Sequence, residues 1–366
     1  MSAVVRPARP DEWPAVGALT ERAFAAGPYG HLPVSAERRA LVHAVGERAA
    51  SGAVLVAESD RGLVGTVSLL RAGTPQSRLA TGDEAELRLL AVDPAAGGRG
   101  LGRALASVAQ EAALGWGASA VVLDTGTRNR TAQSLYDRLG YRVLDRASRT
   151  GEAGGAGGAR GGGGAGDAER TPGTAPAGDR IDHVEYRLPL RERDDLVVRL
   201  VRDHEIAAVA ALSLRAYEHD YDVSPTYRAS ILDVGERARE HQVWVATDAS
   251  DGTLLGTVAT PGRGATISPL ARAGELDFRL LAVDPAARGR GVGAALTRHA
   301  IELARLRGLE RVVMNSGPQM TGAHRLYGRL GFARLPEREH EISDGGRTFR
   351  LLAFSIDVPD APVTIA

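Results

Sequence analysis

The chain has 366 residues, more than one average domain needs, and 43% of them are hydrophobic, enough to build globular cores. Lys plus Arg and Asp plus Glu number 45 each, so the formal net charge is zero and no broad basic surface for nucleic acid is expected. Because cysteine is absent, disulfides, thiolate metal sites and a cysteine acyl-enzyme are excluded.

The sequence also lacks the patterns of a membrane or metal-binding protein. It has no long apolar run that would span a membrane, and Met1 to Arg9 has no apolar signal-peptide core. We therefore expect a cytoplasmic protein without a membrane partner. The nine histidines are scattered and no pair has the helical spacing of a zinc site, so we expect no metal.

The first half of the chain alternates predicted strands and helices. A short strand at Val4 to Arg6 precedes a helix that Asp11 would cap. Next come a strand hairpin, a third strand, a helix, a strand, a helix and a short strand, at residues 53–58, 63–70, 85–92, 102–114, 120–124, 131–139 and 141–144. This order predicts an α/β domain with a mixed sheet, in the α+β sense.

The second half, from about Leu196, repeats the first. Four segments return 191 positions later: Gly65–Val67 at Gly256–Val258, Leu89–Pro94 at Leu280–Pro285, Arg99–Gly102 at Arg290–Gly293, and Leu135–Tyr141 at Leu326–Phe332. Four matches in one register indicate a duplicated domain and not a short-period solenoid.

A tract rich in Gly and Ala, Gly151 to Gly178, interrupts the first half, and its composition predicts disorder over about residues 149–180. One interpretation makes it the interdomain linker. The repeat favours another, because the second copy ends on a strand at Thr348 to Asp357 whose counterpart, His183 to Leu190, follows the tract. We therefore predict an N-terminal domain over residues 1–190 that contains the tract as a loop, a short charged linker, and a C-terminal domain over residues 196–366.

Each copy carries a glycine-rich loop between a strand and a helix, read in the second copy as Arg288 to Gly293. Glycines allow close backbone approach, and the free N–H groups of a helix start form an anion site that suits a pyrophosphate. A P-loop would need Gly-Lys-Ser/Thr, and a dinucleotide fingerprint a further glycine where Ala294 and its apolar neighbours stand. A plain glycine turn is the remaining alternative. The occurrence of the same loop in both copies makes this alternative weaker.

The strand with Leu-Ala-Val-Asp-Pro, the glycine loop and the following helix resemble the coenzyme A-binding motif of the GNAT N-acetyltransferase superfamily. The later segments Leu135–Tyr141 and Leu326–Phe332 resemble that family's late helix and strand. The resemblance covers nearly all of both halves outside the Gly tract, and it is specific for the superfamily but not for the acceptor. The tandem layout is similar to mycothiol synthase, a two-copy member, in architecture and not in substrate.

The resemblance implies acetyl-CoA as co-substrate, with its pantetheine arm beside strand backbone and its pyrophosphate on the loop amides. The implied cofactor-binding residues are Leu90, Val92, Gly98, Arg99, Gly100, Gly102, Arg103 and Asn129 in the first copy, and Leu281, Val283, Arg288, Gly289, Arg290, Gly291, Gly293 and Ala294 in the second. The acetyl group would pass directly to an amine, in agreement with the missing cysteine.

The resemblance also implies catalytic residues. Tyr136 and Tyr327 match the family tyrosine that protonates the leaving thiolate, with a plain core tyrosine as the alternative. Glu86 and Asp277 match a strand carboxylate that activates the amine through water in some members, with a solvent-facing carboxylate as the alternative. At a further functional acid position the first copy has Asp124, but the second has Asn315, which cannot act as a base.

The two copies differ at the loop and at the acceptor side. The first copy has Gly97 where the second has Arg288, whereas it keeps Asn129 where the second has Met320. We expect the second copy to be the catalytic one and the first a weaker or structural binder. The segment after the first helix usually shapes the acceptor pocket. It is acidic and aromatic at Tyr217–Asp222, which suits a cationic amine or is a solvated loop, and neutral to basic at Gly27–Arg39.

The expected function is acetyl transfer to a primary amine of a small molecule, protein or peptide. The alternative is an acyl-CoA-binding sensor or scaffold in which one or both copies do not turn over. A monomer that is an internal pseudo-dimer and a homodimer both agree with the duplication.

Overall fold

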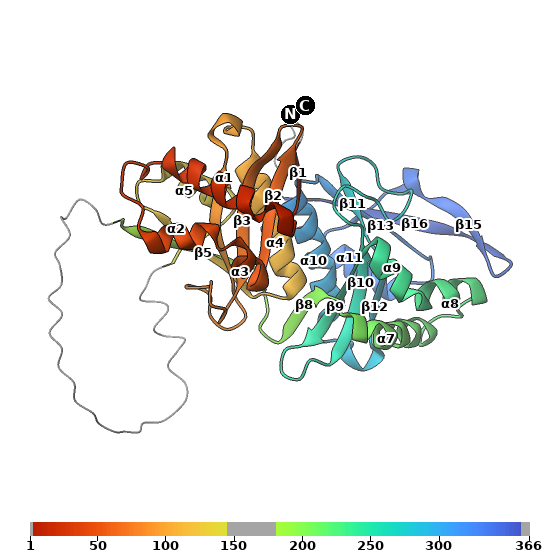
Figure 1. Ribbon diagram of the computed structural model, residues 1–366. Helices are drawn as coiled ribbons and strands as arrows, with labels where there is room; N and C mark the ends of the chain where they lie inside the picture. Colours follow the sequence, from red (N-terminus) through yellow and green to blue (C-terminus); the bar gives the residue numbers. More distant parts are fainter. Residues whose placement is uncertain (1–2, 145–180, 360–366) are drawn as a thin grey trace, which may run out of the picture. The chain divides into compact units, whose positions relative to one another are not determined.

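The computed structural model describes residues 3–144 and 181–359, so the tract predicted to be disordered lies outside the described residues. The chain forms two compact units. Unit 1 comprises Met1–Ala109 and Ser119–Pro189, and unit 2 comprises Gln110–Ala118 and Leu190–Ala366. Each unit is a mixed α/β structure, which confirms the predicted fold class (Figure 1).

Unit 1 contains one seven-stranded sheet in the order β1-β2-β3-β4-β5-β7-β6. Its strands are β1 Val4–Pro7, β2 Gly52–Ser59, β3 Gly62–Arg71, β4 Ala85–Val92, β5 Ala120–Gly126, β6 Arg142–Val143 and β7 His183–Pro189. Only β4 and β5 are parallel. Strand β7, which follows the Gly tract in sequence, pairs with β5 and β6.

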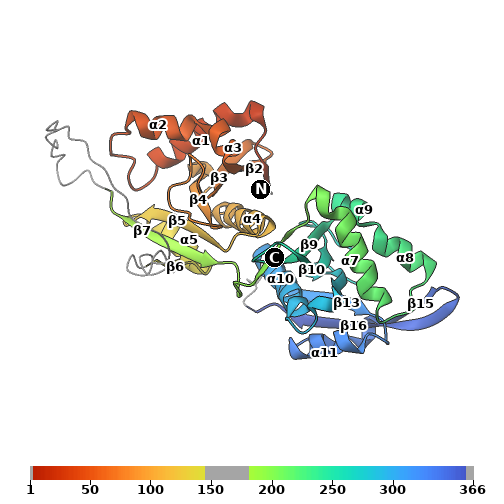
Figure 2. The same ribbon diagram turned by 90° about the horizontal axis from the view of Figure 1, so that it is seen from below.

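Helices cover both faces of this sheet. They are α1 Trp13–Ala25, α2 Ala36–His43, α3 Val45–Ala50, α4 Leu101–Trp116 and α5 Arg130–Arg138. Val16 on α1 packs against Val54 and Val56 of β2, whereas a Cβ on Gly65 of β3 would meet Leu105 of α4, so α1 and α4 lie on opposite faces (Figure 2). Because successive side chains of a strand point to opposite faces of the sheet, β2 contributes side chains to the packing on both faces.

The start of α1 differs from the prediction. A 3₁₀ turn, Pro10–Glu12, precedes it, and Glu12 instead of Asp11 occupies the N-cap position. The Glu12 carboxylate accepts a hydrogen bond from the Arg9 backbone N–H at 2.7 Å and from Arg6 at 2.6 and 2.8 Å. These bonds lower the pKa of Glu12 to about 2, and Asp11, directed to solvent, takes no part in the cap.

Unit 2 repeats this plan with its central sheet divided in two. One sheet has the order β12-β10-β9-β8, and the other has the order β11-β13-β16-β14 with β15 added to β16. The strands are β8 Leu196–Leu200, β9 Gln242–Asp248, β10 Leu254–Thr260, β11 Glu275–Asp277, β12 Arg279–Val283, β13 Arg311–Ser316, β14 Ala333–Arg334, β15 His340–Asp344 and β16 Arg347–Asp357. The helices are α7 Ile206–Glu218, α8 Pro225–Leu232, α9 Val234–Glu240, α10 Val292–Arg307 and α11 Thr321–Arg329.

Two helices in each copy, α2 with α3 and α8 with α9, were not predicted from the sequence. Ser35 caps α2 by accepting from the Arg38 N–H, and Ser224 caps α8 by accepting from the Tyr227 N–H. The equivalent caps show that Arg38 and Tyr227 occupy corresponding positions. In the described part of the chain, no helix combines the length and apolar character needed to cross a bilayer.

Candidate functional site

The same backbone distortion occurs on β4 and on β12. Leu89 and Leu280 each have a φ of 53°, in the left-handed region that residues with a Cβ seldom adopt. At these points the register with the antiparallel neighbour shifts, between Thr66 and Ser68 and between Thr257 and Ala259. An extra residue in one strand is a β-bulge, which bends the strand. Each bulge therefore turns its strand away from the parallel neighbour.

A gap between two parallel strands follows from this bend. Strands β4 and β5 pair only at Ala85–Val121 and Glu86–Val122, and β11 pairs with β13 over three residues that end at Asp277. The four strand residues predicted to hold pantetheine lie beyond these pairs: Leu90 and Val92 on β4, and Leu281 and Val283 on β12. Strand backbone past the last pair can bond to an extended ligand.

The glycine loop lies at the open end of this gap in each copy. Gly98 and Gly100 have φ values of 75°, and Gly289 and Gly291 have φ values of 79°. A Cβ on Gly98, Gly100 or Gly289 would meet no atom within 4 Å, so open space lies beside these backbone turns. Left-handed glycines allow the N–H groups to line that space, as an anion requires.

The helix after each loop supplies further N–H groups. Gly291 is the N-cap of α10, and Gly293 and Ala294 lie in its first turn, where backbone N–H groups have no partner within the helix. Gly102 and Arg103 lie in the first turn of α4, and Arg103 and Arg99 are exposed. The positive end of the helix dipole therefore faces the loop in both copies.

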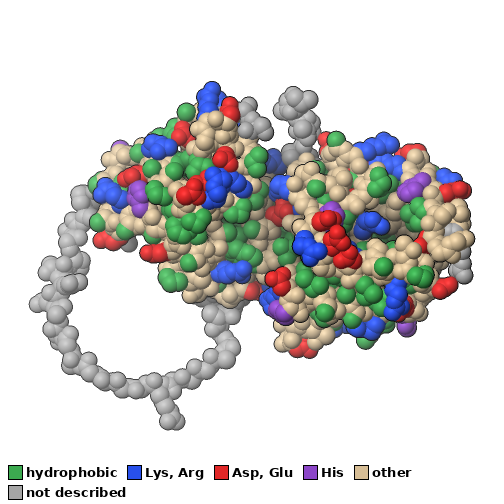
Figure 3. Space-filling model, turned by 45° about the vertical axis from the view of Figure 1, so that its right-hand side comes forward, with side chains coloured by type: hydrophobic (Ala, Val, Ile, Leu, Met, Phe, Trp, Pro, Cys, Tyr) green, Lys and Arg blue, Asp and Glu red, His purple; other side chains and the backbone are tan. Residues whose placement is uncertain are grey.

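Two arginines of the second loop, Arg288 and Arg290, and the neighbouring Arg193 each pair with an aspartate. The pairs are Arg288 with Asp220 at 2.7 Å, Arg290 with Asp248 at 2.7 Å, and Arg193 with Asp195 at 2.5 Å. On the face drawn in Figure 3, basic and acidic side chains likewise lie next to one another.

Arg193 was not predicted from the sequence. Its Nη1 donates to the Arg290 carbonyl at 2.7 Å and would lie 2.6 Å from a Cβ on Gly291. Its only sequence signal is its position in the charged linker.

The residues present fit an acyl-coenzyme A. Open cradles at the glycines suit a pyrophosphate. The Oδ1 atom of Asn315 on β13 is buried without a hydrogen-bond partner among the described atoms, which leaves an acceptor for an amide N–H. Asn129 caps α5, because its side chain accepts from the Ala132 N–H at 3.3 Å, so its side-chain amide retains two donors. Among the described residues, no cluster of three or more His, Asp or Glu side chains is arranged to hold a metal ion.

The two strand carboxylates fix the loop that precedes their strand. Glu86 is fully buried and accepts from Ser77 Oγ at 2.9 Å and from the backbone N–H groups of Arg78 and Leu79 at 2.5 and 2.7 Å. Asp277, also fully buried, accepts from the Ile267 N–H at 3.0 Å and from Ser268 Oγ at 2.7 Å. Neither carboxylate faces solvent. Both oxygens of Asp277 are engaged in these bonds, so a proton transfer would have to pass through this bonded network.

The two predicted acid tyrosines lie in aromatic surroundings. Tyr136, 4% exposed, has ring centroids of Tyr141 and Tyr186 within 5.8 Å. Tyr327, 3% exposed, packs against Phe332 and Phe354. Burial raises the pKa of both phenols, which keeps them protonated at neutral pH, as a general acid requires.

Two histidines near these tyrosines were not singled out from the sequence. His183 Nδ1 lies 2.9 Å from Asp124 Oδ2, and Asp124 also contributes to the raised pKa of Tyr136. In the second copy, His324 on α11 lies one helical turn before Tyr327, and its Nε2 is 3.1 Å from Ser316 Oγ. Burial lowers the pKa of His324, which favours its neutral form. Strand pairing and helix position create both arrangements, and neither has a sequence pattern.

In the segment Tyr217–Asp222, expected to receive a cationic amine, two acidic side chains pair with arginines from outside the segment. Asp220 bonds to Arg288, and Glu218 bonds to Arg228. What remains is aromatic: Tyr217 contacts Tyr227 with ring centroids 5.6 Å apart, and burial raises the pKa of both. The neighbouring tyrosines also raise the pKa of Tyr327, which places this aromatic group beside the predicted acid.

Sequence comparisons relate both copies to known proteins. A family model described as the Acetyltransferase (GNAT) family matches residues 16–141 and 206–332. Glucosamine 6-phosphate N-acetyltransferase 1 of Oryza sativa subsp. japonica is 35% identical over 106 residues, 29% of this chain and 61% of that protein. A mycothiol acetyltransferase of Cellulomonas flavigena is 37% identical over 105 residues, 27% of this chain and 30% of that protein. The chain thus spans less than two thirds of the length of either relative.

Among solved structures, a putative acetyltransferase from Salmonella typhimurium with its cofactor acetyl-CoA aligns with a TM-score of 0.35 and 19% identity. The alignment covers 47% of this chain and 99% of that one.

Proposed function

Because the two matches cover most of the chain and place it in the GNAT acetyltransferase family, we propose that it transfers the acetyl group of acetyl-CoA directly to a primary amine. The acceptor is an amine of a small molecule or of a peptide. The second copy is the catalytic one in this proposal, and the first binds the same co-substrate more weakly.

One observation carries the proposal. In both copies a strand with a bulge separates from its parallel neighbour, and the gap opens next to a loop of left-handed glycines at a helix N-terminus. The positive φ values of Leu89 and Leu280 are costly for residues with a Cβ, and such strain concentrates at functional sites.

Acetyl-CoA supplies the acetyl group as a reactive thioester. In the second copy, Gly289, Gly291 and the first turn of α10 hold the pyrophosphate, with Arg288, Arg290 and Arg193 able to add charge. Backbone at Leu281 and Val283 lines the pantetheine arm. These contacts fix the thioester at the gap, which lowers the entropy cost of the attack.

Chemistry then needs a base for the amine and an acid for the leaving sulfur. Asp277 is the proposed base, acting through water, and its bonds to Ile267 and Ser268 hold it in place. The amine nitrogen attacks the thioester carbon, the C–S bond breaks, and Tyr327 gives its proton to the departing thiolate. The neutral Tyr327 phenol is supported by its raised pKa.

The arginines around the loop support the second copy as the stronger cofactor site. Gly97 replaces Arg288 in the first copy, although the glycine turns there are the same. A sensor or scaffold that binds acyl-CoA without turnover is the second candidate. It is favoured by the full engagement of Asp277 in structural bonds.

A thiol-release assay distinguishes the two candidates. Purified chain is mixed with acetyl-CoA and a panel of primary amines, and free coenzyme A is followed with a thiol reagent; the chain has no cysteine to add background. Release that depends on an amine supports the transferase. Saturable acetyl-CoA binding without amine-dependent release across the panel supports the sensor.

A further inference from the structure

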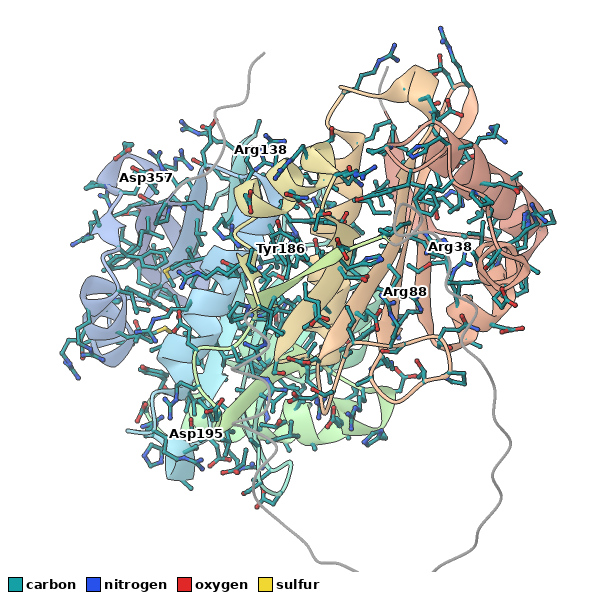
Figure 4. The ribbon with its side chains drawn as sticks, turned by 90° about the vertical axis from the view of Figure 1, so that its left-hand side faces the viewer. Arg38, Arg88, Arg138, Tyr186, Asp195 and Asp357 are labelled. Atoms are coloured by element: carbon teal, nitrogen blue, oxygen red, sulfur yellow. The ribbon has the colours of Figure 1, made fainter. Side chains whose placement is uncertain are left out.

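Arginines gather on the acceptor side of the first copy. Arg38 on α2, Arg78 in the loop before β4, and Arg88 on β4 act electrostatically on one another, and Figure 4 labels Arg38 and Arg88 in the same part of unit 1. Arg88 lies one residue before the bulge at Leu89. The group therefore lies at the point where the gap opens.

Each arginine is held differently. Arg78 pairs with Asp124, and Arg88 lies 3.3 Å from Glu86 and donates to the Gln76 carbonyl at 2.5 Å. Arg38 stacks over the ring of Phe24 at 5.3 Å, and no described carboxylate pairs with it. An aromatic face positions a guanidinium while leaving its N–H groups for another partner.

Arg88 has the Glu86 carboxylate beside it, whereas Arg38 forms no ion pair with a described carboxylate. Desolvation, Arg88 and Arg78 lower the pKa of Arg38 and Asp124 raises it, although the residue as a whole is exposed. Burial lowers the pKa of Arg88, Glu86 and Asp124 oppose this shift, and Arg78 adds to it. An anion placed among these groups would reverse this cost, because an opposite charge favours the charged form.

The second copy lacks this arrangement. Tyr227 stands where Arg38 stands, as the caps Ser224 and Ser35 show, and it contacts Tyr217 edge-on. At the 191-residue offset, Arg78 corresponds to Pro269 and Asp124 to Asn315, and only Arg88 has an arginine counterpart, Arg279. The cationic group is thus a property of one copy and not of the fold.

The arginines also lie close to Tyr136, the tyrosine at the predicted acid position of the first copy. Asp124 contributes both to the pKa of Arg38 and to that of Tyr136, so the acid and the arginines share one electrostatic neighbourhood. An acceptor anion at Arg38 would leave the other end of a small molecule free to approach the gap. This is the arrangement needed to orient an amine.

We infer that the first copy binds an amine that carries an anionic group, a carboxylate or a phosphate, with Arg38 as its principal contact and Arg88 and Arg78 beside it. The inference rests on the proposed function, since it names the acceptor class of one acetyltransferase copy. Arg38 is a binding residue, and a neutral substitution there should weaken anion recognition without altering the cofactor loop.

The test is isothermal titration of the full chain in saturating coenzyme A, which prevents acetyl transfer. Glucosamine 6-phosphate is compared with glucosamine, and L-aspartate with L-asparagine, so that each pair differs by one anionic group. We expect the anionic member of at least one pair to bind about tenfold more tightly, as a charge-assisted bond would give. The pair that shows the preference identifies the anion.

Arg38→Gln should abolish that preference, and Arg38→Lys should keep part of it. Arg39→Gln is the matched control, because Arg39 is the next residue on α2 and pairs with Glu21 at 3.5 Å. Equal affinity within both pairs, absence of anion binding, or an undiminished preference in Arg38→Gln would overturn the inference. Anion preference without thiol release would overturn the transferase and leave the anion site standing.

Discussion

The two copies agree in the bulged strand and the glycine loop and diverge in the helices α1 and α2 against α7 and α8. Both have a bulge at a leucine with φ 53°, a pair of left-handed glycines and a buried carboxylate that fixes the preceding loop. Between the first two helices of each copy, Arg38 stacks on Phe24 in the first copy, whereas Tyr227 packs on Tyr217 in the second. The backbone geometry that we propose for the co-substrate is retained, while the side chains that we propose for the acceptor are exchanged.

The largest expected difference between the copies concerns the two tyrosines. Tyr327→Phe should lower turnover about a hundredfold or more, the range of a lost general acid, with little change in acetyl-CoA affinity. Tyr136→Phe should lower turnover far less when the second copy is the catalytic one. Steady-state thiol release with each variant measures both. Equal losses would make the copies equivalent catalysts, and unchanged turnover in Tyr327→Phe would exclude its acid role.

The two buried carboxylates should hold their loops to different degrees. Glu86 accepts from two backbone N–H groups and Asp277 from one. Removing either carboxylate leaves its N–H donors buried without an acceptor, which costs about 1–3 kcal/mol of stability in each loop. Glu86→Ala should therefore speed amide exchange in residues 72–84 more than Asp277→Ala does in residues 261–274.

Hydrogen exchange followed by mass spectrometry measures this difference. Ser77→Ala and Ser268→Ala serve as milder controls, since each removes one hydroxyl bond to the same carboxylate. Unchanged exchange in both carboxylate variants would show that these bonds do not fix the loops.

A core histidine should make the second copy more sensitive to acid. His299 on α10 lies 4.1 Å from Trp244 between ring centroids, and burial lowers its pKa to about 3. Its counterpart in the first copy is Val108. Because the folded pKa lies below the ordinary value, the unfolded state binds the extra proton, and stability is lost as pH falls from about 6.5 toward 3.

His299→Val should remove about 1–2 kcal/mol of the stability loss between pH 7 and pH 5. Calorimetric unfolding at both pH values measures it, and His340→Gln, at an exposed position on β15, is the control. A variant whose pH dependence equals that of the parent would contradict the assignment.

The smallest effect is expected from the linker arginine at the second loop. Arg193→Gln should weaken acetyl-CoA binding by roughly threefold to tenfold, because a partly exposed guanidinium adds a modest, screened contribution. Arg298→Gln is the matched control: it removes an exposed arginine paired with Glu192 at 3.6 Å. Titration at two salt concentrations should show a weaker salt dependence in Arg193→Gln alone. An equal loss of acetyl-CoA affinity in both variants would show that only the overall positive charge matters, and not a contact of Arg193 at the loop.

Much of this arrangement followed from local sequence. The alternation of strand and helix and the 191-residue repeat predicted the sheets, the loops and the place of the strand after the Gly tract. The helices α2 and α8 were missed because each has only eight residues, about two turns, over which an apolar periodicity is hard to recognise. They also lie outside the 191-residue register, since Ser35 and Ser224 are 189 positions apart.

The remaining features depend on contacts between distant residues. The bulges place leucine, and not glycine, at positive φ, so no residue type marks them. The pairing of His183 with Asp124 requires β7 to pair with β5, and the stacking of Arg38 on Phe24 requires α2 to pack against α1. Asp220 was expected to face the acceptor, yet it pairs with Arg288 of the cofactor loop.

The most direct test of the account is the stoichiometry of acetyl-CoA binding, measured by isothermal titration of the full chain with Gly291→Glu and Gly100→Glu. A carboxylate in either loop would repel the pyrophosphate. Gly252→Glu, at a left-handed turn with open space away from the loop, controls for backbone strain. The account predicts a strong site that only Gly291→Glu removes and a weaker one that only Gly100→Glu removes. Binding unaffected by both variants, or no binding in the parent chain, would contradict it.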